Sequence, residues 1–409
     1  MERAVLLSTG DELTAGRVVD TNSTYIAEKL YSLGLLVTAI IKVGDNKDTI
    51  LWTLSQAVEM GDIIIGTGGL GPTADDLTNE TVAAFLGRDL ILHHDVVENL
   101  KRRAETRGQS WTSNNEKQAL LPEGAEIVPN PVGSAPGFRV GLGRRKMLFW
   151  LPGVPREMEA MLKQTVLPWI ASHRGPGEEN SSLTFKIYGL TESRLDDALK
   201  DLCLPKSARL SFRAHFPDLT LRVSVRGTHE REKQLEELGR QIRTRIGPHI
   251  YAEGDETLED IVGRLLLKKG WTLAVAESCT GGFISHRITR VAGSSAYFMS
   301  GAVTYSNEAK VRLGVSRASL DNHGPVSSET ARAMALAVRE QSGADVGLSV
   351  TGVAGPSGGS TAIPVGTVWI GIAHPGGSEA RQFHFTGDRE RVILGASQAA
   401  LYWLRSLLF

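Results

Sequence analysis

The sequence predicts an α/β protein of more than one domain. Apolar strands alternate with amphipathic helices through most of the chain, and several strands run directly into glycine-rich loops. A length of 409 residues corresponds to roughly two to four domains of usual size. The 44 glycines cluster at strand ends, where sheets of this class bind their ligands.

The first segment, residues 1–172, has the pattern of a doubly wound parallel sheet covered by helices on both faces. Its best-defined helix places Ile26, Leu30 and Leu33 on one face and meets Gly34 where a helix should stop. The expected elements are a strand over 3–9, helices over 21–33 and 48–60, strands over 35–42 and 62–65, a helix over 95–107, a strand over 146–151 and a helix over 155–167.

A linker rich in glycine and charge, residues 172–179, precedes a small α+β segment over 180–252. In its clearest strand, Leu219, Leu221, Val223 and Val225 alternate with polar residues, as expected when one face is buried. The expected order is β-α-β-β-α-β: a strand over 185–188, a helix over 191–202, strands over 209–215 and 219–226, a helix over 229–245 and a strand over 249–251.

The third segment, residues 255–409, is again α/β and begins with a helix over 258–269. A strand over 272–275 exits into Ser278, Cys279, Thr280, Gly281 and Gly282, and a helix follows. A second strand, over 346–350, exits into another glycine-rich loop over 352–359.

Composition excludes several functional classes. Lys+Arg total 45 against 46 Asp+Glu, so a formal net charge of -1 makes nucleic acid an unlikely partner. No apolar run reaches the about 18 residues of a membrane span, and Asp11 and Glu12 come too early for a signal-peptide core. We therefore expect a cytoplasmic protein without a membrane partner. Cys203 and Cys279 are too few and too far apart for a zinc ligand set or a disulfide framework.

Ser278 is the first candidate for chemistry. A serine at a strand exit before a helix can have its hydroxyl near unpaired N–H groups that stabilise an oxyanion. Alternatively, Ser278 or Thr280 simply caps the helix. Tyr305 and Lys310 favour catalysis, because a desolvated lysine can serve as the base for a serine nucleophile. The competing interpretation of Lys310 is a solvated surface lysine.

The C-terminal segment closely resembles the C-terminal domain of the CinA family, which is related to stand-alone nicotinamide-nucleotide amidases. The resemblance rests on the motifs at 276–282, 293–295, 303–310, 352–356 and 364–369. It implies hydrolysis of nicotinamide mononucleotide to nicotinate mononucleotide and ammonia, with no cofactor at this site.

The same resemblance implies roles for individual residues. Ser278 is the expected nucleophile, Lys310 its base and Tyr305 a hydroxyl that helps to position the proton. Backbone N–H groups around Thr280 to Gly282 are the expected oxyanion donors. The remaining expected substrate-binding residues, including a phosphate-binding arginine, are Asn307, Gly352, Ala354, Gly355 and Arg389.

The N-terminal segment carries a second candidate site. The loop formed by Gly68, Gly69, Gly71 and Thr73 lets backbone amides approach phosphates. The next acidic residues, Asp75 and Asp76, can hold a divalent metal that neutralises a pyrophosphate. Asp11 and Asp45 also follow strand ends and complete the expected metal ligands. The competing interpretation of Asp76 is a helix N-cap.

These motifs, with those at 10–13, 16–22, 115–119, 130–137 and 152–158, resemble the CinA N-terminal domain, which is similar to the molybdopterin-binding proteins MogA and MoaB. The resemblance implies hydrolysis of ADP-ribose to AMP and ribose phosphate, with a metal of the Mg²⁺ or Co²⁺ type. Asn22 falls in a matched motif and is expected to bind substrate. Nucleotidyl transfer to a pterin is the alternative chemistry.

The middle segment resembles the KH-type domain of CinA proteins. Residues 180–252 contain no Gly-x-x-Gly loop, which RNA-binding KH domains need, so we interpret this domain as a spacer or dimerisation module. The chain as a whole is then expected to be a two-enzyme homodimer of pyridine-nucleotide metabolism. The alternative is a nucleotide-binding regulatory or scaffold protein for competence or DNA repair.

Overall fold

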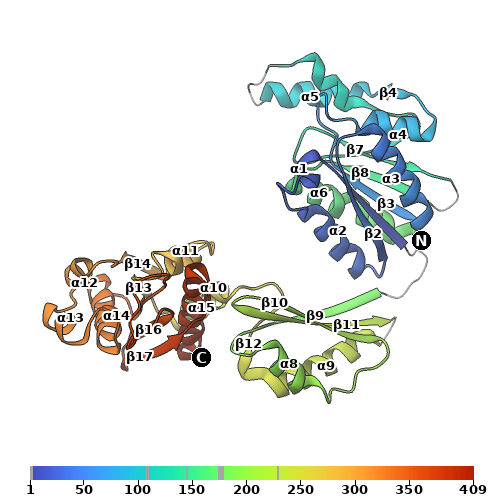
Figure 1. The fold of residues 1–409 in the computed structure, drawn as a ribbon. Coiled ribbons are helices and arrows are strands. Elements are labelled where there is room, and N and C mark those ends of the chain that lie inside the picture. The colour runs from blue at the N-terminus through green and yellow to red at the C-terminus, as the bar shows by residue number, and fades with distance from the viewer. Residues whose placement is uncertain (1–2, 107, 109, 144–145, 174–178, 228–229) are drawn as a thin grey trace. The chain divides into compact units, whose positions relative to one another are not determined.

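The structure is a computed structural model that describes the chain except residues 1–2, 107, 109, 144–145, 174–178 and 228–229. The inner part of the expected linker and the ends of two expected helices, at 107 and 229, therefore lie outside the described residues. The chain forms two compact units: residues 1–181 with 225–232, and residues 182–224 with 233–409 (Figure 1). The predicted α/β class is confirmed.

The N-terminal sheet has the strand order β2-β1-β3-β8-β7-β6. The first four strands of this order are mutually parallel, whereas β7 is antiparallel to both of its neighbours, β8 and β6. The strands are β1 (Arg3–Thr9), β2 (Leu36–Val43), β3 (Ile63–Thr67), β6 (Glu126–Val128), β7 (Gly137–Gly141) and β8 (Met147–Leu151). A separate ribbon pairs β4 (Leu90–Leu92) with β5 (Leu120–Pro122).

Alternate residues of β1 face opposite sides of this sheet, and both sides are buried under helices (Figure 1). Leu6 packs in one core with Ile26 of α2, while Leu7 packs in the other with Leu54 of α3. The doubly wound pattern is thus confirmed. The helices are α1 (Asp11–Thr14), α2 (Thr21–Ser32), α3 (Lys47–Met60), α4 (Thr78–Leu86), α5 (His94–Thr106), α6 (Pro155–Met161) and α7 (Leu167–His173), with 3-10 helix η1 (Ser113–Ala119).

The helix expected over 155–167 continues further than predicted. A π-helical turn, η2 (Leu162–Val166), joins α6 to α7, which ends at His173. Pro168 lies at the second position of α7, and a proline is tolerated in the first turn of a helix, where its missing N–H is not needed.

The middle segment has the predicted β-α-β-β-α-β order and the sheet order β10-β11-β9-β12. Leu221, Val223 and Val225 are fully buried, as their alternation predicted. The elements are β9 (Glu179–Ile187), α8 (Glu192–Leu199), β10 (Ala208–His215), β11 (Asp218–Gly227), α9 (Arg231–Ile246), 3-10 helix η3 (Gly247–His249) and β12 (Ile250–Glu253).

The C-terminal sheet has the order β14-β13-β15-β16-β17, in which β13 is parallel to both of its neighbours and β16 is antiparallel to both β15 and β17. Its strands are β13 (Leu273–Glu277), β14 (Phe298–Val303), β15 (Val346–Gly352), β16 (Thr367–His374) and β17 (Gly377–His384). Its helices are α10 (Leu258–Lys269), α11 (Phe283–Thr289), η4 (Ser294–Ala296), α12 (Asn307–Leu313), α13 (Arg317–His323), α14 (Ser328–Ser342) and α15 (Arg389–Leu408).

Helices cover both faces of this sheet too, with α10 and α15 over one core and α14 over the other. Parallel β13 and β15 end at the same edge, so the two glycine-rich loops lie side by side there. No helix in the described part of the chain is long and apolar enough to cross a membrane.

Candidate active sites

The C-terminal pocket has a volume of about 270 Å³ and lies where β13 and β15 end. The Ser278 N–H donates to the Val350 carbonyl over 2.9 Å, which fixes the serine beside the second strand. The pocket brings together most of the residues expected from the sequence: Ser278, Tyr305, Asn307, Lys310, Gly352, Ala354, Gly355 and Arg389.

Lys310 is buried and points at Ser278. Its side chain belongs to α12, which Ser306 caps by accepting the Ala309 N–H over 3.1 Å. Only 2% of Lys310 is exposed, and its Nζ lies 3.0 Å from Ser278 Oγ and 2.8 Å from the Thr304 carbonyl oxygen. Burial lowers the pKa of this amine. The interpretation of Lys310 as a solvated surface lysine is therefore wrong.

A buried carboxylate that the sequence analysis did not single out organises the loop after Ser278. Glu277 is 0% exposed and accepts the N–H groups of Gly282, Ile284 and Ser285 over 2.8–3.1 Å, together with the Ser285 hydroxyl over 2.7 Å. The glutamate thus satisfies the N-terminal N–H groups of α11 from the preceding strand. A carboxylate directly between an apolar strand and a glycine-rich helix entry was the available signal.

This arrangement changes the expected roles of the loop. The N-cap of α11 is Gly282 and has no side-chain cap bond, so the interpretation of Ser278 or Thr280 as a cap is wrong. The Gly281 N–H donates to the Ser278 carbonyl over 3.1 Å and the Gly282 N–H to Glu277, which leaves neither free for an oxyanion. Thr280 is 3% exposed, and its hydroxyl has no hydrogen-bond partner among the described residues.

Arg389 reaches the pocket from the first position of α15, a helix that Asp388 caps by accepting the Arg391 N–H over 2.8 Å. Its guanidinium donates to the Tyr305 hydroxyl and to the Gly355 carbonyl, each over 2.7 Å. Tyr305 thus lies beside Arg389. The Tyr305 hydroxyl is hydrogen-bonded to the Arg389 guanidinium and not to Ser278 or Lys310. A guanidinium at the N-terminus of a long helix suits an anionic group of a ligand.

The N-terminal pocket has a volume of about 380 Å³ and lies at the carboxyl ends of the parallel strands. Gly68 and Gly69 have φ of 101° and 65°. A Cβ atom would approach the Thr9 carbonyl oxygen to 2.4 Å at Gly68 and Thr78 Oγ1 to 2.2 Å at Gly69. Only glycine fits both positions, and the backbone of the loop is therefore open to the pocket.

Asp76 is held within this loop. Its carboxylate accepts the N–H and the hydroxyl of Thr73, over 2.9 and 2.5 Å. The N-cap of α4 is Leu77, without a side-chain cap bond, so the interpretation of Asp76 as a helix cap is wrong. The Thr73 hydroxyl also lowers the pKa of Asp75.

Asp11 and Asp45 each accept the backbone N–H of the other, over 3.0 and 3.1 Å. Burial raises the pKa of Asp45; the backbone N–H of Asp11 opposes this rise, and the carboxylates of Asp11, Glu12 and Asp75 add to it. A cluster of carboxylates such as Asp11, Glu12, Asp45 and Asp75 favours binding of a cation.

The expected metal ligands do not form a complete cage. In the ranges that the structure describes, no three His, Cys, Asp or Glu side chains are grouped so that they could hold a metal ion. However, Asp45, Asp75 and Asp76 line the same pocket. Such a donor set fits a hard cation such as Mg²⁺ that takes one or two carboxylates from the protein and further oxygens from phosphates.

The lining of this pocket includes residues from the matched motifs that were not singled out as site residues. Glu157 and Gln118 line it, and Glu157 accepts a hydrogen bond from Asn130 Nδ2 over 2.7 Å. Asn22, which was expected to bind substrate, is not among the lining residues; it donates to the carbonyl of Gly153, which does line the pocket, over 2.7 Å. Asn22 and Gly153 are 131 positions apart, and they meet because the strands that precede them, β1 and β8, belong to the same sheet.

Three family descriptions match consecutive segments of the chain. "Probable molybdopterin binding domain" matches residues 5–172, "Damage-inducible protein CinA KH domain" residues 182–252, and "CinA C-terminal domain" residues 255–408. A solved structure of the protein CinA, with unknown function, from Thermoplasma acidophilum is 38% identical and covers 40% of this chain and 94% of its own, with a TM-score of 0.37.

Full-length relatives are similar along almost the whole sequence. A CinA-like protein of Geotalea uraniireducens is 43% identical over 407 residues, which are 98% of this chain and 96% of the relative. A CinA-like protein of Geobacter metallireducens is 42% identical over 412 residues, 99% of each chain. The chain therefore belongs to the CinA family.

Proposed function

We propose that the C-terminal pocket is the active site of a serine amidase that hydrolyses nicotinamide mononucleotide. The observation that carries this proposal is the 3.0 Å contact between Ser278 Oγ and Lys310 Nζ, with Lys310 only 2% exposed. A buried lysine whose pKa is lowered by burial is a suitable base for a serine hydroxyl. A protein that only binds a nucleotide has no need for this pair.

The reaction follows from these contacts. Neutral Lys310 accepts the Ser278 hydroxyl proton while Ser278 Oγ bonds to the carboxamide carbon. The unpaired Thr280 hydroxyl lies close to this serine in the chain and is the candidate donor to the resulting oxyanion. Collapse of the tetrahedral intermediate breaks the C–N bond, and Lys310 gives its proton to the departing nitrogen, which leaves as ammonia. Water then attacks the acyl-serine and gives a proton to Lys310. The bond between the acyl carbon and Ser278 Oγ breaks, Lys310 returns this proton to Ser278 Oγ, and the acid product ionises to a carboxylate.

The position of Arg389 is the argument that the substrate carries a phosphate. Its guanidinium and the N-terminus of α15 provide positive charge at one side of the pocket, and the Gly355 loop is held against it. A substrate that carries a carboxamide at one end and a phosphate at the other fits this arrangement.

The test is the release of ammonia from nicotinamide mononucleotide by the full chain. We expect Ser278→Ala to abolish release and Ser319→Ala, a serine outside the pocket, to leave it unchanged. If the wild type binds the nucleotide but releases no ammonia, a regulatory binding protein is favoured instead. If Ser278→Ala stays active, the serine mechanism is wrong.

We further propose that the N-terminal pocket hydrolyses ADP-ribose to AMP and ribose 5-phosphate. The support is the open glycine loop beside Asp45, Asp75 and Asp76 in a pocket of about 380 Å³. A divalent metal bound there would neutralise the pyrophosphate charge. The residues of the chain would bind its phosphates through the backbone of the loop and orient the metal ligands through Thr73.

This second activity is tested with ADP-ribose and Mg²⁺ or Co²⁺ by following AMP formation. Asp76→Ala should abolish it, whereas Asp89→Ala, an exposed aspartate outside the pocket, should not. Activity untouched by Asp76→Ala would contradict the assignment. Transfer of the nucleotide to a pterin without hydrolysis of ADP-ribose would favour the alternative chemistry.

A further inference from the structure

Two helices carry separate parts of the amidase pocket. Helix α11 directly follows the loop from Ser278 to Gly282, and α15 begins with Arg389. The placement of one helix against the other therefore determines how far the nucleophile lies from the arginine.

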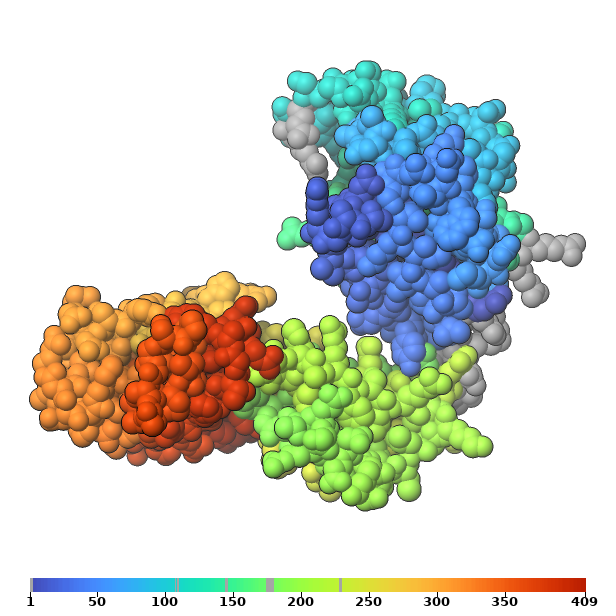
Figure 2. Space-filling model, in the orientation of Figure 1, coloured from blue at the N-terminus to red at the C-terminus, as the bar shows by residue number. Residues whose placement is uncertain are grey.

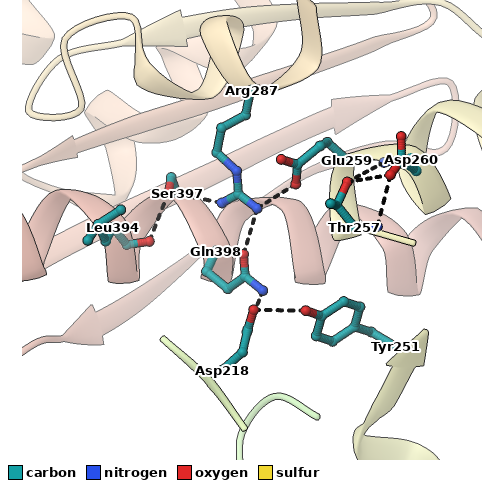
Figure 3. A network of polar contacts seen from close by, with 9 residues as sticks. All are labelled: Asp218, Tyr251, Thr257, Glu259, Asp260, Arg287, Leu394, Ser397 and Gln398. Carbon is teal, nitrogen blue, oxygen red and sulfur yellow. Dashed lines mark hydrogen bonds and ion pairs between the residues drawn. The ribbon is translucent and has the colours of Figure 1, made fainter. Parts of the chain in front are cut away.

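Arg287 of α11 ties these helices together (Figure 3). Its guanidinium donates to Ser397 Oγ over 3.1 Å and to Gln398 Oε1 over 2.7 Å, both on α15. It also pairs with Glu259 of α10 over 2.7 Å, and the two charged side chains are only 13% and 11% exposed. Charge-assisted bonds in such a partly dry environment hold a defined geometry.

The middle domain completes this network through Asp218, which lies at the start of β11 (Figure 3). Its carboxylate accepts Gln398 Nε2 over 2.6 Å and the Tyr251 hydroxyl over 2.8 Å. Gln398 is 1% exposed, and its amide has only one orientation that satisfies both neighbours. The reverse orientation would place its NH₂ group against Arg287 and its oxygen against Asp218.

Further contacts hold α15 against the middle domain. Tyr402 donates to the Pro248 carbonyl over 2.6 Å, and Arg405 donates to the Ile250 carbonyl over 3.0 Å. Tyr251 and Ala252 are buried in the same hydrophobic core as α10 and α15. Residues 182–224 and 233–409 accordingly form one compact unit, in which the two domains are also adjacent in the space-filling view (Figure 2).

We propose that Asp218 is a positioning residue for the amidase site, supplied by the KH-type domain. Asp218 orients the Gln398 amide, Gln398 orients Arg287, and Arg287 holds α11 and α15 at the spacing that the pocket needs. The domain thus supports the catalytic domain in addition to linking it to the N-terminal unit. This inference rests on the proposed amidase function for its kinetic consequence, but not for its structural one.

Hydrogen–deuterium exchange tests the structural consequence without any substrate. In Asp218→Ala, we expect faster exchange in residues 283–289 and 389–398, because Gln398 and Tyr251 lose their buried acceptor. Asp218→Asn preserves the size of the side chain and one acceptor oxygen, and should show a smaller change. The matched control is Asp196→Ala, an exposed aspartate of the same domain. Unchanged exchange in both Asp218 variants would overturn the proposal.

Kinetics test the functional consequence. If Arg389 shifts, the KM for nicotinamide mononucleotide should rise about 3- to 30-fold in Asp218→Ala, the range expected for coupling through packed networks. The KM for nicotinamide riboside, which has no phosphate, should change much less. Equal changes for both compounds would contradict a positioning role.

A double-mutant cycle separates this inference from the amidase assignment. Asp218→Ala combined with Gln398→Ala should destabilise the unit against thermal unfolding no more than the larger single change, because the two residues act on Arg287 in series. Fully additive shifts in Tm would overturn the network. A wild type that releases no ammonia would refute the amidase proposal, while the exchange and unfolding measurements would still decide the role of Asp218.

Discussion

The Arg389 guanidinium donates a hydrogen bond to the Tyr305 hydroxyl over 2.7 Å, although 84 positions separate the two residues. The resemblance to amidases suggested that Tyr305 helps to position the proton at the serine. Its bond to Arg389 and its 60% exposure indicate instead that the hydroxyl orients the arginine at the entrance of the pocket.

Tyr305→Phe should therefore weaken substrate binding more than it slows chemistry. We expect the KM for nicotinamide mononucleotide to rise about 5- to 30-fold, equivalent to about 1 to 2 kcal/mol, with little change in kcat. Steady-state kinetics with the nucleotide and with its riboside provide the measurement and its control. A fall in kcat at constant KM would place Tyr305 in proton transfer.

The activity should rise with pH through the pKa of Lys310. Burial lowers this pKa from its ordinary value of 10.5, and only the neutral amine can accept the serine proton. The midpoint of the kcat/KM profile is thus expected below pH 10.5. Lys310→Arg stays charged and should lose about 10²- to 10⁴-fold in rate, the usual contribution of a positioned base. A profile without an ascending limb would contradict this role.

Folding stability should depend on the same group. The unfolded chain binds a proton at Lys310 up to about pH 10.5, whereas the folded chain releases it at lower pH. The free energy of unfolding should consequently rise with pH between the lowered pKa and about 10.5. Urea unfolding of the wild type and of Lys310→Met measures this contribution, which should be missing in the variant.

Glu277→Gln should disturb the loop that runs from Ser278 to Gly282. The substitution keeps the size of the side chain but removes the charge and places an NH₂ group among the N–H groups of α11. Because the carboxylate is fully buried and accepts four hydrogen bonds, we expect a loss of about 2 to 4 kcal/mol in stability and a lower kcat. Thermal unfolding and ammonia release are the measurements. Glu329→Gln, an exposed glutamate in the first turn of α14, is the control.

As the pH falls, the N-terminal pocket should lose its affinity for a metal at a higher pH than an ordinary carboxylate site does. Burial raises the pKa of Asp45, so this ligand becomes protonated earlier as the pH falls. Calorimetric titration of the full chain with Mg²⁺ between pH 4.5 and 7.5 would show the loss. Asp45→Asn should bind weakly throughout and flatten this pH dependence, and a wild-type affinity independent of pH would exclude Asp45 as a ligand.

Much of the fold could be predicted because the signals are local. Helix α2 ends at Ser32, with Gly34 in the left-handed conformation just beyond it, and the strands β3, β13 and β15 run into the predicted glycine loops. Short motifs also singled out Ser278 and Lys310, which the structure brings into contact. Glu277 was missed because three of its four hydrogen-bond donors are backbone N–H groups, which the identity of the following residues does not reveal. Its place between an apolar strand and a glycine-rich loop was the available signal.

The sequence by itself determined the strand and helix pattern, the glycine loops, and the resemblance that names the family and pairs Ser278 with Lys310, because these depend on periodicity and short motifs. Only the tertiary structure decided three contacts. Arg389 donates to Tyr305, Glu277 accepts N–H groups at the start of α11, and Asp218 accepts from Gln398, which is 180 positions away. These contacts exist because packing brings distant elements together and excludes water around them, and buried polar groups then need specific partners.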